Sequence, residues 1–215
     1  MTADFTGQVA AITGASGGIG RVLARRYARR GAVVALVARR PHELALTADL
    51  IAAEGGIASV HVADIRDEAQ CADVIGAIVR RWSRLDVLVN NAAVAGIDQS
   101  VSDADLANWQ NVLATNLVAP AILTREALRQ AMIPARRGNV QFISSAAARN
   151  VQPRKAHYAA AKLGLTALAQ TLALETGESG IRVNTVVVGS VAGELLDTYV
   201  SVSYTHLTLP TTPYV

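Results

Sequence analysis

Short apolar runs alternate along the chain with longer stretches in which apolar residues recur at helical spacing. The short runs are rich in valine and isoleucine and show little inward–outward alternation, as expected for parallel strands covered on both faces. Six strands are predicted, over Val9–Thr13, Val33–Val37, Ala58–Val62, Leu85–Val89, Val140–Ser144 and Val183–Val188. Five helices are predicted between them, over Gly18–Arg30, Glu43–Glu54, Glu68–Trp82, Asp105–Ile133 and Lys155–Thr176.

The repeated order of strand, helix and strand predicts right-handed crossovers and a parallel sheet. Neither a solenoid-type repeat nor an interdomain linker interrupts this order, so we expect an α/β fold, a Rossmann-type doubly wound parallel sheet in a single domain. Two local signals refine the helices. Asp67 and Gln70 form a capping pair for the third helix, and Pro120 should kink or split the fourth.

The composition is that of a folded globular protein and narrows the choice of partners. Apolar residues make up 51% of the 215 residues, charged residues make up 17%, and the formal net charge is +3. Pairs of adjacent arginines suggest a nucleic-acid surface at first sight. They fall on different predicted helices or near helix ends, with no aromatic residues between them, so solvated helix faces are the favoured interpretation.

Several classes of protein and site are disfavoured. Cys71 is the only cysteine, so an internal disulfide is excluded, and no metal-ligand spacing is present. The first residues, MTADFTGQ, are polar and acidic, unlike a signal peptide. No apolar run approaches the length of a membrane span. We therefore expect a cytoplasmic protein with no metal, no nucleic-acid partner and no membrane contact.

The first predicted strand leads directly into the stretch TGASGGIG (residues 13–20), which a helix follows. Glycines there allow a sharp turn and a close backbone approach to a pyrophosphate, and the helix start offers free N–H groups to its negative charge. A tight turn alone would also need glycines, but the position between strand and helix favours a dinucleotide site. The candidate contacts are Gly14, Ser16, Gly18, Ile19 and Gly20.

Arg39 and Arg40 follow the second predicted strand, where a nucleotide fold contacts the adenosine ribose. An acidic residue at this point would bind the free 2′-hydroxyl of NAD, and none is present. Two guanidinium groups instead suit the 2′-phosphate of NADP. NADP(H) is therefore the preferred cofactor in this prediction, with NAD(H) as the alternative. The alternative explanation of this pair is that both arginines are solvated and bind no ligand.

The third and fourth predicted strands also end in polar residues at the same edge of the sheet. Asp64 is placed to accept a hydrogen bond from the adenine amino group, although a turn or a cap would also explain it. Asn90 and Asn91 follow the fourth strand, and their amides need partners if they are buried. The small residues Ala92 and Ala93 come next and leave room for a flat ligand along the backbone.

Tyr158 and Lys162 lie one turn apart on one face of the last predicted helix, and Ser145 follows the fifth strand. A nearby ammonium lowers the pKa of a tyrosine, which can then relay a proton at an oxygen that gains or loses a hydride. Serine can hold the same oxygen. A surface tyrosine–lysine pair and a simple turn at Ser145 remain alternatives. We expect His157 to be exposed or to cap the helix, without a catalytic role.

Together these motifs resemble the short-chain dehydrogenase/reductase family in its compact single-domain form. The matching elements occur in the family's order, with similar spacing, from Gly7 to about Leu196. They are TGASGGIG, Asp64, NNAA, Asn116 within NVLATNL, Ser145, the YAAAK run from Tyr158 to Lys162, and IRVNTVVVG. The resemblance implies a catalytic tetrad of Asn116, Ser145, Tyr158 and Lys162.

The resemblance also implies a role for each member of the tetrad. Tyr158 would be the general acid/base, and Lys162 would bind the nicotinamide ribose and lower the tyrosine pKa. Ser145 would orient the substrate carbonyl, and Asn116 would anchor a water in a proton relay. Further cofactor contacts are implied at Ile65, Asn91, Ala92, Gly189 and Val191.

Three positions depart from the family pattern. The usual NNAG reads NNAA, with Ala93 in place of the glycine. The usual Pro-Gly after the sixth strand reads Val188-Gly189, and the threonine that bonds the nicotinamide carboxamide falls at Gly193. The last two departures weaken the expected positioning of the cofactor.

From Val202 the composition changes abruptly to VSYTHLTLPTTPYV, without lysine or arginine. This string resembles translated adapter sequence at the ends of fragments from environmental sequencing. We therefore expect an NAD(P)-binding Rossmann catalytic domain over residues 1–200, truncated at its C-terminus and lacking the last strand. Residues 201–215 would be a disordered, non-native tail, with a genuine disordered terminus as the alternative.

The predicted function is hydride transfer between NADP(H) and a hydroxyl or carbonyl group of a small or medium substrate. A 3-oxoacyl reductase and a sugar or polyol dehydrogenase both fit the resemblance. The alternative is a nucleotide-binding fragment without catalysis. The resemblance further suggests a homo-oligomer, a dimer or a tetramer, with the long fourth helix and the tyrosine-bearing helix at one interface.

Overall fold

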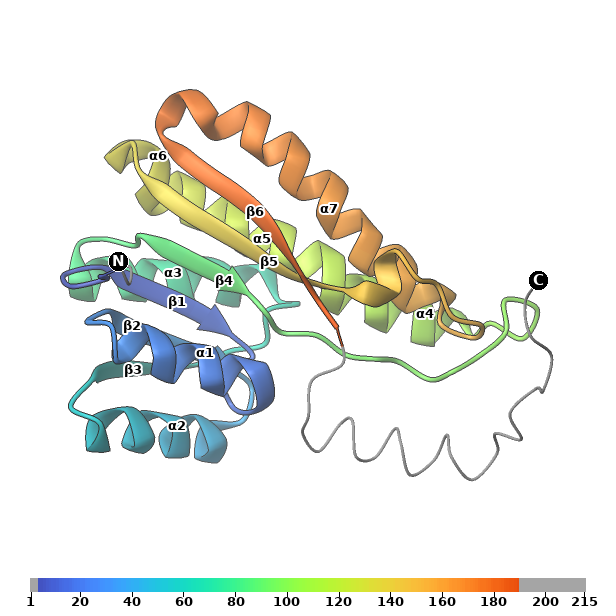
Figure 1. Cartoon of the computed structure of the whole chain (residues 1–215), viewed down its shortest axis with the longest axis horizontal. Coiled ribbons are helices and arrows are strands. Elements are labelled where there is room, and N and C mark those ends of the chain that lie inside the picture. The colour runs from blue at the N-terminus through green and yellow to red at the C-terminus, as the bar shows by residue number, and fades with distance from the viewer. Residues whose placement is uncertain (1–3, 190–215) are drawn as a thin grey trace, which may run out of the picture.

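A computed structural model describes residues 4–189 of the chain. Its centre is a six-stranded sheet in the order β3-β2-β1-β4-β5-β6, and every neighbouring pair is parallel (Figure 1). The strands are β1 (Val9–Thr13), β2 (Val33–Ala38), β3 (Ile57–Val62), β4 (Val87–Asn90), β5 (Gly138–Ser145) and β6 (Ile181–Val188). The predicted doubly wound single domain is confirmed.

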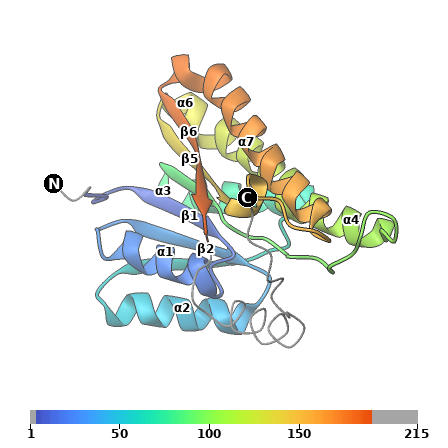
Figure 2. The same ribbon diagram turned by 45° about the vertical axis from the view of Figure 1, so that its right-hand side comes forward.

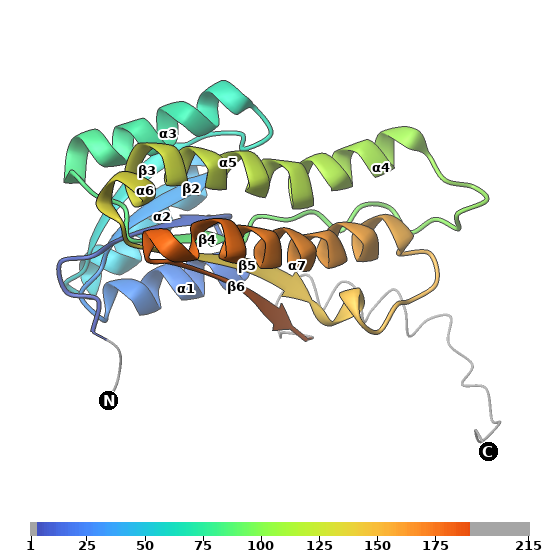
Figure 3. The same ribbon diagram turned by 90° about the horizontal axis from the view of Figure 1, so that it is seen from above.

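Helices cover both faces of the sheet in two layers (Figure 3). On one face lie α1 (Gly18–Ala28) and α2 (Pro41–Ala53), and on the other lie α3 (Glu68–Trp82), α5 (Ala119–Ala127) and α7 (Ala156–Thr176). The central strand β1 shows why its residues are apolar throughout. Val9 and Ala11 enter the core under α3, α5 and α7, whereas Ala10 and Ile12 enter the core under α1 and α2.

The fourth predicted helix is a continuous helical run that contains two π turns. It consists of α4 (Leu106–Leu113), the π turn η1 (Ala114–Val118), α5, the π turn η2 (Leu128–Met132) and α6 (Ile133–Ala135). Pro120 occupies the first turn of α5, directly after η1. The helix therefore accommodates the missing proline N–H by a change of winding at this point, in the place where a kink or a split was predicted.

The predicted helix cap at Asp67 and Gln70 is present in the structure. The Gln70 N–H donates to the Asp67 carboxylate at 3.1 Å, and the Gln70 side chain donates to the same carboxylate at 2.9 Å, so the capping pair at the start of α3 is confirmed. Two short 3₁₀ turns, η3 (Ala146–Ala148) and η4 (Gly177–Ser179), follow β5 and α7.

The strand order reverses between β1 and β4, because the chain leaves β1 toward β2 and later returns to β4 on the other side. Ligands of doubly wound sheets bind in the crevice at such a point, outside the carboxyl ends of the strands. Here α4 and the start of α7 extend beyond the carboxyl ends of the strands (Figures 1 and 2).

Several predictions fall outside the described residues. These are the absence of a last strand, the tail over residues 201–215, and the positions of Val191 and Gly193. Within residues 4–189, no helix is long and apolar enough to cross a membrane. The same residues contain no cluster of histidine, cysteine or acidic side chains arranged for a metal ion.

Candidate active site

The glycine-rich loop between β1 and α1 is shaped by close backbone packing. A Cβ at Gly20 would clash with the Gly14 carbonyl and lie 2.7 Å from Asn91 Nδ2, so only glycine fits there. Gly18 has a positive φ of 49°, and a Cβ on it would meet nothing within 4 Å. Gly17, the residue before α1, gives no side-chain cap. The first N–H groups of α1 therefore remain available to an anion in open space.

Thr13, which the sequence analysis did not single out, joins this loop to the end of β4. Its Oγ1 accepts hydrogen bonds from the N–H groups of Asn91 (2.9 Å) and Ala92 (3.0 Å), and Asn91 Nδ2 donates to the Thr13 carbonyl at 2.8 Å. The predicted need of the Asn91 amide for a partner is met here. Asn90 Nδ2 donates to Thr124 Oγ1 at 2.9 Å, while Asn90 Oδ1 has no partner among the described residues.

Two further side chains hold the loop from its other side. Arg21 Nη2 donates to the Ser16 carbonyl at 2.7 Å, and Arg21 Nε donates to Thr47 Oγ1 at 2.9 Å. Thr47 Oγ1 also lies 3.0 Å from the Ala15 carbonyl. Ile19 is half-buried in the first turn of α1. Neither Arg21 nor Thr47 carries a motif that would reveal this contact, because they meet only when α1 and α2 pack together.

The two arginines after β2 lie beside the loop. Arg40 Nη2 donates to the Ser16 hydroxyl at 3.2 Å, and Arg40 Nη1 lies 3.6 Å from Glu43 Oε1. Arg39 is exposed. Both guanidinium groups thus carry positive charge at the edge of the crevice, and Arg40 is anchored to the loop itself.

Asp64, at the end of β3, lies in a turn. Its carboxylate accepts from the Arg66 N–H at 3.0 Å and from the Arg66 guanidinium at 2.5 Å, and Gln70 Oε1 accepts from the Asp64 N–H at 2.9 Å. The bonds from Arg66 are the main cause of a lowered Asp64 pKa, to which Arg39 adds a smaller effect. The turn interpretation therefore has direct support. The Ile65 side chain is buried in the core, so only its backbone can face a ligand.

Ser145, Tyr158 and Lys162 come together where β5 ends and α7 begins. A side-chain hydrogen bond joins Tyr158 to Ser145, and Lys162 Nζ lies 5.7 Å from the centroid of the Tyr158 ring. Lys162 Nζ donates to the Ile143 carbonyl at 2.8 Å, and Ser144 Oγ donates to the Lys162 carbonyl at 2.9 Å. These bonds fix α7 against β5 and hold the predicted triad at the edge of the sheet.

Burial shifts the pKa values of both Tyr158 and Lys162. Burial raises the pKa of Tyr158 above its usual value, and the hydrogen bond with Ser145 opposes the rise. Burial also lowers the pKa of Lys162 to about 8. Burial thus disfavours the phenolate and the ammonium alike, and the expectation that Lys162 lowers the tyrosine pKa stays a prediction. The phenol is protonated at neutral pH, as a proton donor must be.

The segment between β4 and α4 is held by two buried asparagines. Asn116, in the π turn η1, accepts from the Val94 N–H and donates to the Val94 carbonyl, both at 2.8 Å. Asn108, in α4, pairs in the same way with Ile97, and both distances are 2.9 Å. The side-chain amide of Asn116 is thus committed to the backbone of this segment, which borders the crevice.

His157 is buried, with 1% of its surface exposed, so the prediction of an exposed or capping residue is wrong. Its Nε2 lies 3.2 Å from the Ala95 carbonyl and must carry the proton, since a carbonyl only accepts. Its ring packs edge-on against Trp109, with centroids 6.1 Å apart. The sequence did not show that this face of α7 meets the β4–α4 segment. The residue before Tyr158 thereby ties the tyrosine-bearing helix to that segment.

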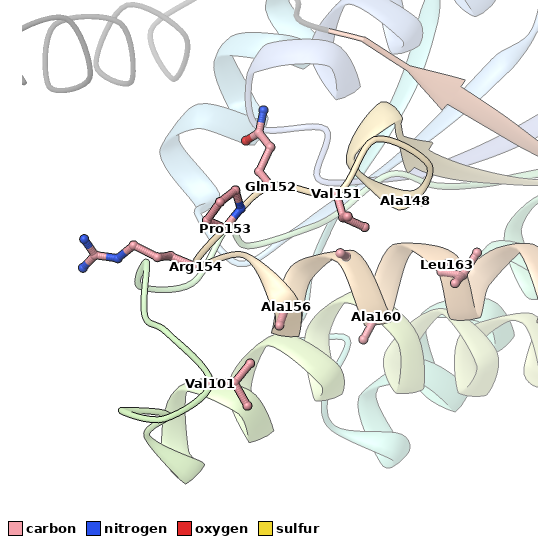
Figure 4. A pocket seen from close by; sticks show the side chains of 10 residues that line it. Val101, Ala148, Val151, Gln152, Pro153, Arg154, Ala156, Ala160 and Leu163 are labelled. Carbon is pink, nitrogen blue, oxygen red and sulfur yellow. The ribbon is translucent and has the colours of Figure 1, made fainter. Parts of the chain in front are cut away.

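An apolar cavity of about 590 Å³ lies beside the first turns of α7 (Figure 4). It does not include the triad, because Lys162 is buried against β5 while the neighbouring Leu163 faces the cavity and is 56% exposed. The loop after β5 forms the other wall. The apolar lining includes Val101, Ala148, Val151, Pro153, Ala156 and Leu163.

Comparison with known proteins decides where this arrangement belongs. The sequence model of the short chain dehydrogenases matches residues 8–201. The chain belongs to the short-chain dehydrogenase family. Its relatives are named as dehydrogenases and reductases, so this short-chain dehydrogenase is an oxidoreductase of CH–OH or carbonyl groups that binds NAD(P).

Two curated relatives illustrate the range of the family. The chain is 36% identical, over 85% of its length and 67% of the relative's, to a protein named as ketoacyl reductase 1 of the granaticin polyketide synthase of Streptomyces violaceoruber. It is 31% identical to glucose 1-dehydrogenase 2 of Bacillus subtilis, over 90% of this chain and 76% of that protein.

Solved structures agree with the fold. A metagenomic short-chain oxidoreductase in complex with NADP is 37% identical, with a TM-score of 0.83, over 94% of this chain and 91% of that one. An NAD⁺-bound xylitol dehydrogenase is 28% identical, with a TM-score of 0.86, over 90% of this chain and 74% of that one. Similar folds in the family thus hold either cofactor.

The buried Lys162 gives the free energy of unfolding a distinctive pH dependence. Its folded pKa of about 8 lies below its ordinary value of 10.5, so the unfolded state binds more protons between these values and stability rises with pH across that window. Below about pH 8 the ammonium is charged in both states, and the penalty of burying it is present in full.

We expect the unfolding free energy of the wild type, minus that of Lys162→Met, to increase by up to about 3 kcal/mol from pH 8 toward pH 10.5. Urea denaturation of both proteins at several pH values measures this difference. Subtraction of the variant removes the contribution of the other titrating groups. A pH-independent difference would contradict the burial of Lys162.

Proposed function

We propose that the chain is an NADP(H)-preferring reductase that converts a carbonyl group of a small or medium substrate to an alcohol. The observation that carries the proposal is the half-buried Tyr158, bonded to Ser145, with its pKa raised by burial and with Lys162 one helical turn later. This group lies at the carboxyl edge of the sheet, as does the glycine-rich loop.

The residues fit a dinucleotide. The open space at Gly18 and the uncapped start of α1 suit the pyrophosphate, and the order Asn91, Ala92 along the crevice suits the nicotinamide half. Gly189 follows β6 at the same edge and is exposed. When bound, the cofactor supplies the hydride, and Lys162 would hold its ribose. Val191 is proposed as a further contact from the family resemblance alone.

The preference for NADP(H) rests on the charge after β2. Arg39 and Arg40 follow β2, where they would meet the adenosine ribose, and no carboxylate follows β2 directly. Glu43 lies 3.6 Å from Arg40, which offsets part of one charge and leaves the other. A 2′-phosphate would gain charge-assisted hydrogen bonds that a 2′-hydroxyl cannot match.

Replacement of both arginines should therefore remove the preference. We expect Arg39→Ala/Arg40→Ala to weaken NADPH binding by about 10- to 100-fold and to change NADH binding little, since a charge-assisted hydrogen bond contributes about 1.5–3 kcal/mol. Titration of cofactor fluorescence measures both affinities. Arg149→Ala, an exposed arginine after η3, is the matched control and should bind both cofactors like the wild type. Equal or tighter NADH binding by the wild type would contradict the preference.

Each residue of the site has a chemical task in this reaction. Ser145 would hold the substrate carbonyl oxygen, and Tyr158 would donate its phenolic proton to that oxygen as the hydride arrives at carbon. The Lys162 ammonium, charged below about pH 8, would stabilise the phenolate that remains. The raised pKa of Tyr158 favours reduction at neutral pH, because the reverse reaction needs a phenolate at the start.

The catalytic role of the phenol is tested by Tyr158→Phe. We expect carbonyl reduction with NADPH to fall by about 10²- to 10⁴-fold, the usual contribution of a positioned proton donor, while NADPH binding is retained. A panel of 3-oxoacyl thioesters, ketoses and aldoses serves to find the substrate. Unchanged turnover in the variant would refute the assignment. If the wild type binds NADPH but reduces nothing in the panel, the nucleotide-binding fragment without catalysis becomes the better account.

The proposal covers both acyl and sugar substrates. The named relatives include a ketoacyl reductase, a glucose dehydrogenase and a xylitol dehydrogenase, and all three substrates carry a secondary alcohol or carbonyl. Asn116 is proposed to complete the tetrad through the segment that it holds at Val94, which borders the substrate side of the crevice.

We further propose a homo-oligomer in which α7 packs against a second copy. This helix exposes apolar side chains along its outer face, with Leu163 56% and Leu174 86% exposed. Since burial of a leucine stabilises an interface by about 1.5–3 kcal/mol, two exposed leucines on one face of the helix favour association.

A single charge on this face should break the assembly. We expect Leu163→Arg to shift the wild-type oligomer toward the monomer in size-exclusion chromatography with light scattering, because an unpaired charge would be buried. Leu46→Arg on α2, on the opposite face of the sheet, is the control and should leave the mass unchanged. A monomeric wild type would contradict the proposal.

A further inference from the structure

A second cavity, of about 320 Å³, opens at the amino ends of the strands, on the side of the sheet away from the catalytic edge. Its volume is at the lower end of the range of small-molecule sites, about 300–1,000 Å³. Three guanidinium groups line it, from Arg84 before β4, Arg137 before β5 and Arg182 in β6. A single carboxylate, that of Asp86, lies among them.

Asp86 organises part of this group and is itself saturated. It is buried, with 7% of its surface exposed, and it accepts from the Val9 N–H at 2.8 Å. Arg84 binds both carboxylate oxygens, at 2.7 and 2.8 Å, and Arg137 Nε reaches one of them at 3.4 Å. The carboxylate thus neutralises about one of the three positive charges and fixes Arg84 in place.

The other two guanidinium groups retain unused donors. Arg182 has no ion-pair or hydrogen-bonded side-chain partner among residues 4–189, and Arg137 has only its long contact with Asp86. A guanidinium presents five N–H donors in a rigid fork that suits phosphate oxygens.

Close packing requires glycine at two positions that line the cavity. Gly138 and Gly180 line it, and a Cβ on either would lie 2.6 Å from the Met132 sulfur or from the Arg136 carbonyl. Gly180 has a positive φ of 71°, which also disfavours any other residue. The floor of the cavity is therefore backbone, and the charged side chains stand around it.

We propose that this cavity is a binding site for a phosphate group, held by Arg137 and Arg182 and by the Arg84 that Asp86 orients. The alternative is that these arginines only offset the partial negative charge of nearby helix ends. Arg136 does so, because its Nη2 donates to the Glu178 carbonyl at 2.6 Å. Arg182 makes no such bond within the described residues. The site is independent of the proposed hydride transfer.

Calorimetric titration of the full chain with inorganic phosphate tests the proposal. The wild type should bind phosphate saturably, and Arg137→Ala/Arg182→Ala should weaken this binding by at least about tenfold. Arg30→Ala removes one exposed charge outside the cavity and should change the affinity less than twofold. Arg182→Lys keeps the charge but loses the fork, so an intermediate affinity in this milder variant supports the site even if the double variant unfolds.

A second titration distinguishes binding in this cavity from binding at the proposed cofactor phosphate site. Arg39→Ala/Arg40→Ala should retain one phosphate per chain. Loss of all binding in this variant, or none in the wild type up to about 10 mM phosphate, overturns the proposal. Titration with phenyl phosphate then distinguishes the source. Affinity equal to or better than that of phosphate indicates the phosphate group of a larger molecule, and weaker affinity indicates the free ion.

Discussion

The hydrogen bonds between Thr13 and the Asn91–Ala92 backbone are the constraint on which the nucleotide side of the site depends. β1 and β4 are neighbours in the sheet, yet the chain leaves them in opposite directions, so their loops would separate without a link. A single hydroxyl at the last position of β1 accepts from two N–H groups of the other loop. Asn91 then packs its amide against Gly14 and Gly20, which adds to the backbone clashes that exclude a side chain at those positions.

The catalytic side depends on a different constraint, which is the fit of α7 against β5. Ser144 and Lys162 connect the helix and the strand through backbone carbonyls and hold the register in which Tyr158 lies beside Ser145. His157 and Asn108 then secure the adjoining β4–α4 segment from the opposite side. The polar groups that perform this work are buried and paired, as the cost of an unpaired buried group requires.

The sequence predicted the fold well, and it proposed site residues from local signals, three of which (Ser145, Tyr158 and Lys162) the structure brings together. The valine-rich strands, the TGASGGIG loop and the Tyr158–Lys162 spacing are all read from residues close together in the chain. The roles of Thr13, Arg21, Thr47 and Asn108 were missed because each depends on a partner brought near only by packing of distant elements. His157 was misjudged for the same reason, since a helix that is apolar all round gives no indication of which face meets the β4–α4 segment.

The direction of the pKa shifts also required the structure, and it changes how the site should work. Spacing alone suggests an ammonium that lowers the tyrosine pKa, but burial acts on both groups and favours their neutral forms. A protonated phenol and a lysine that titrates near pH 8 suit a site in which negative charge appears on oxygen only during the reaction. The ammonium then stabilises the phenolate as it forms, where the interaction lowers the barrier, rather than in the resting enzyme, where a phenolate would have no proton to donate.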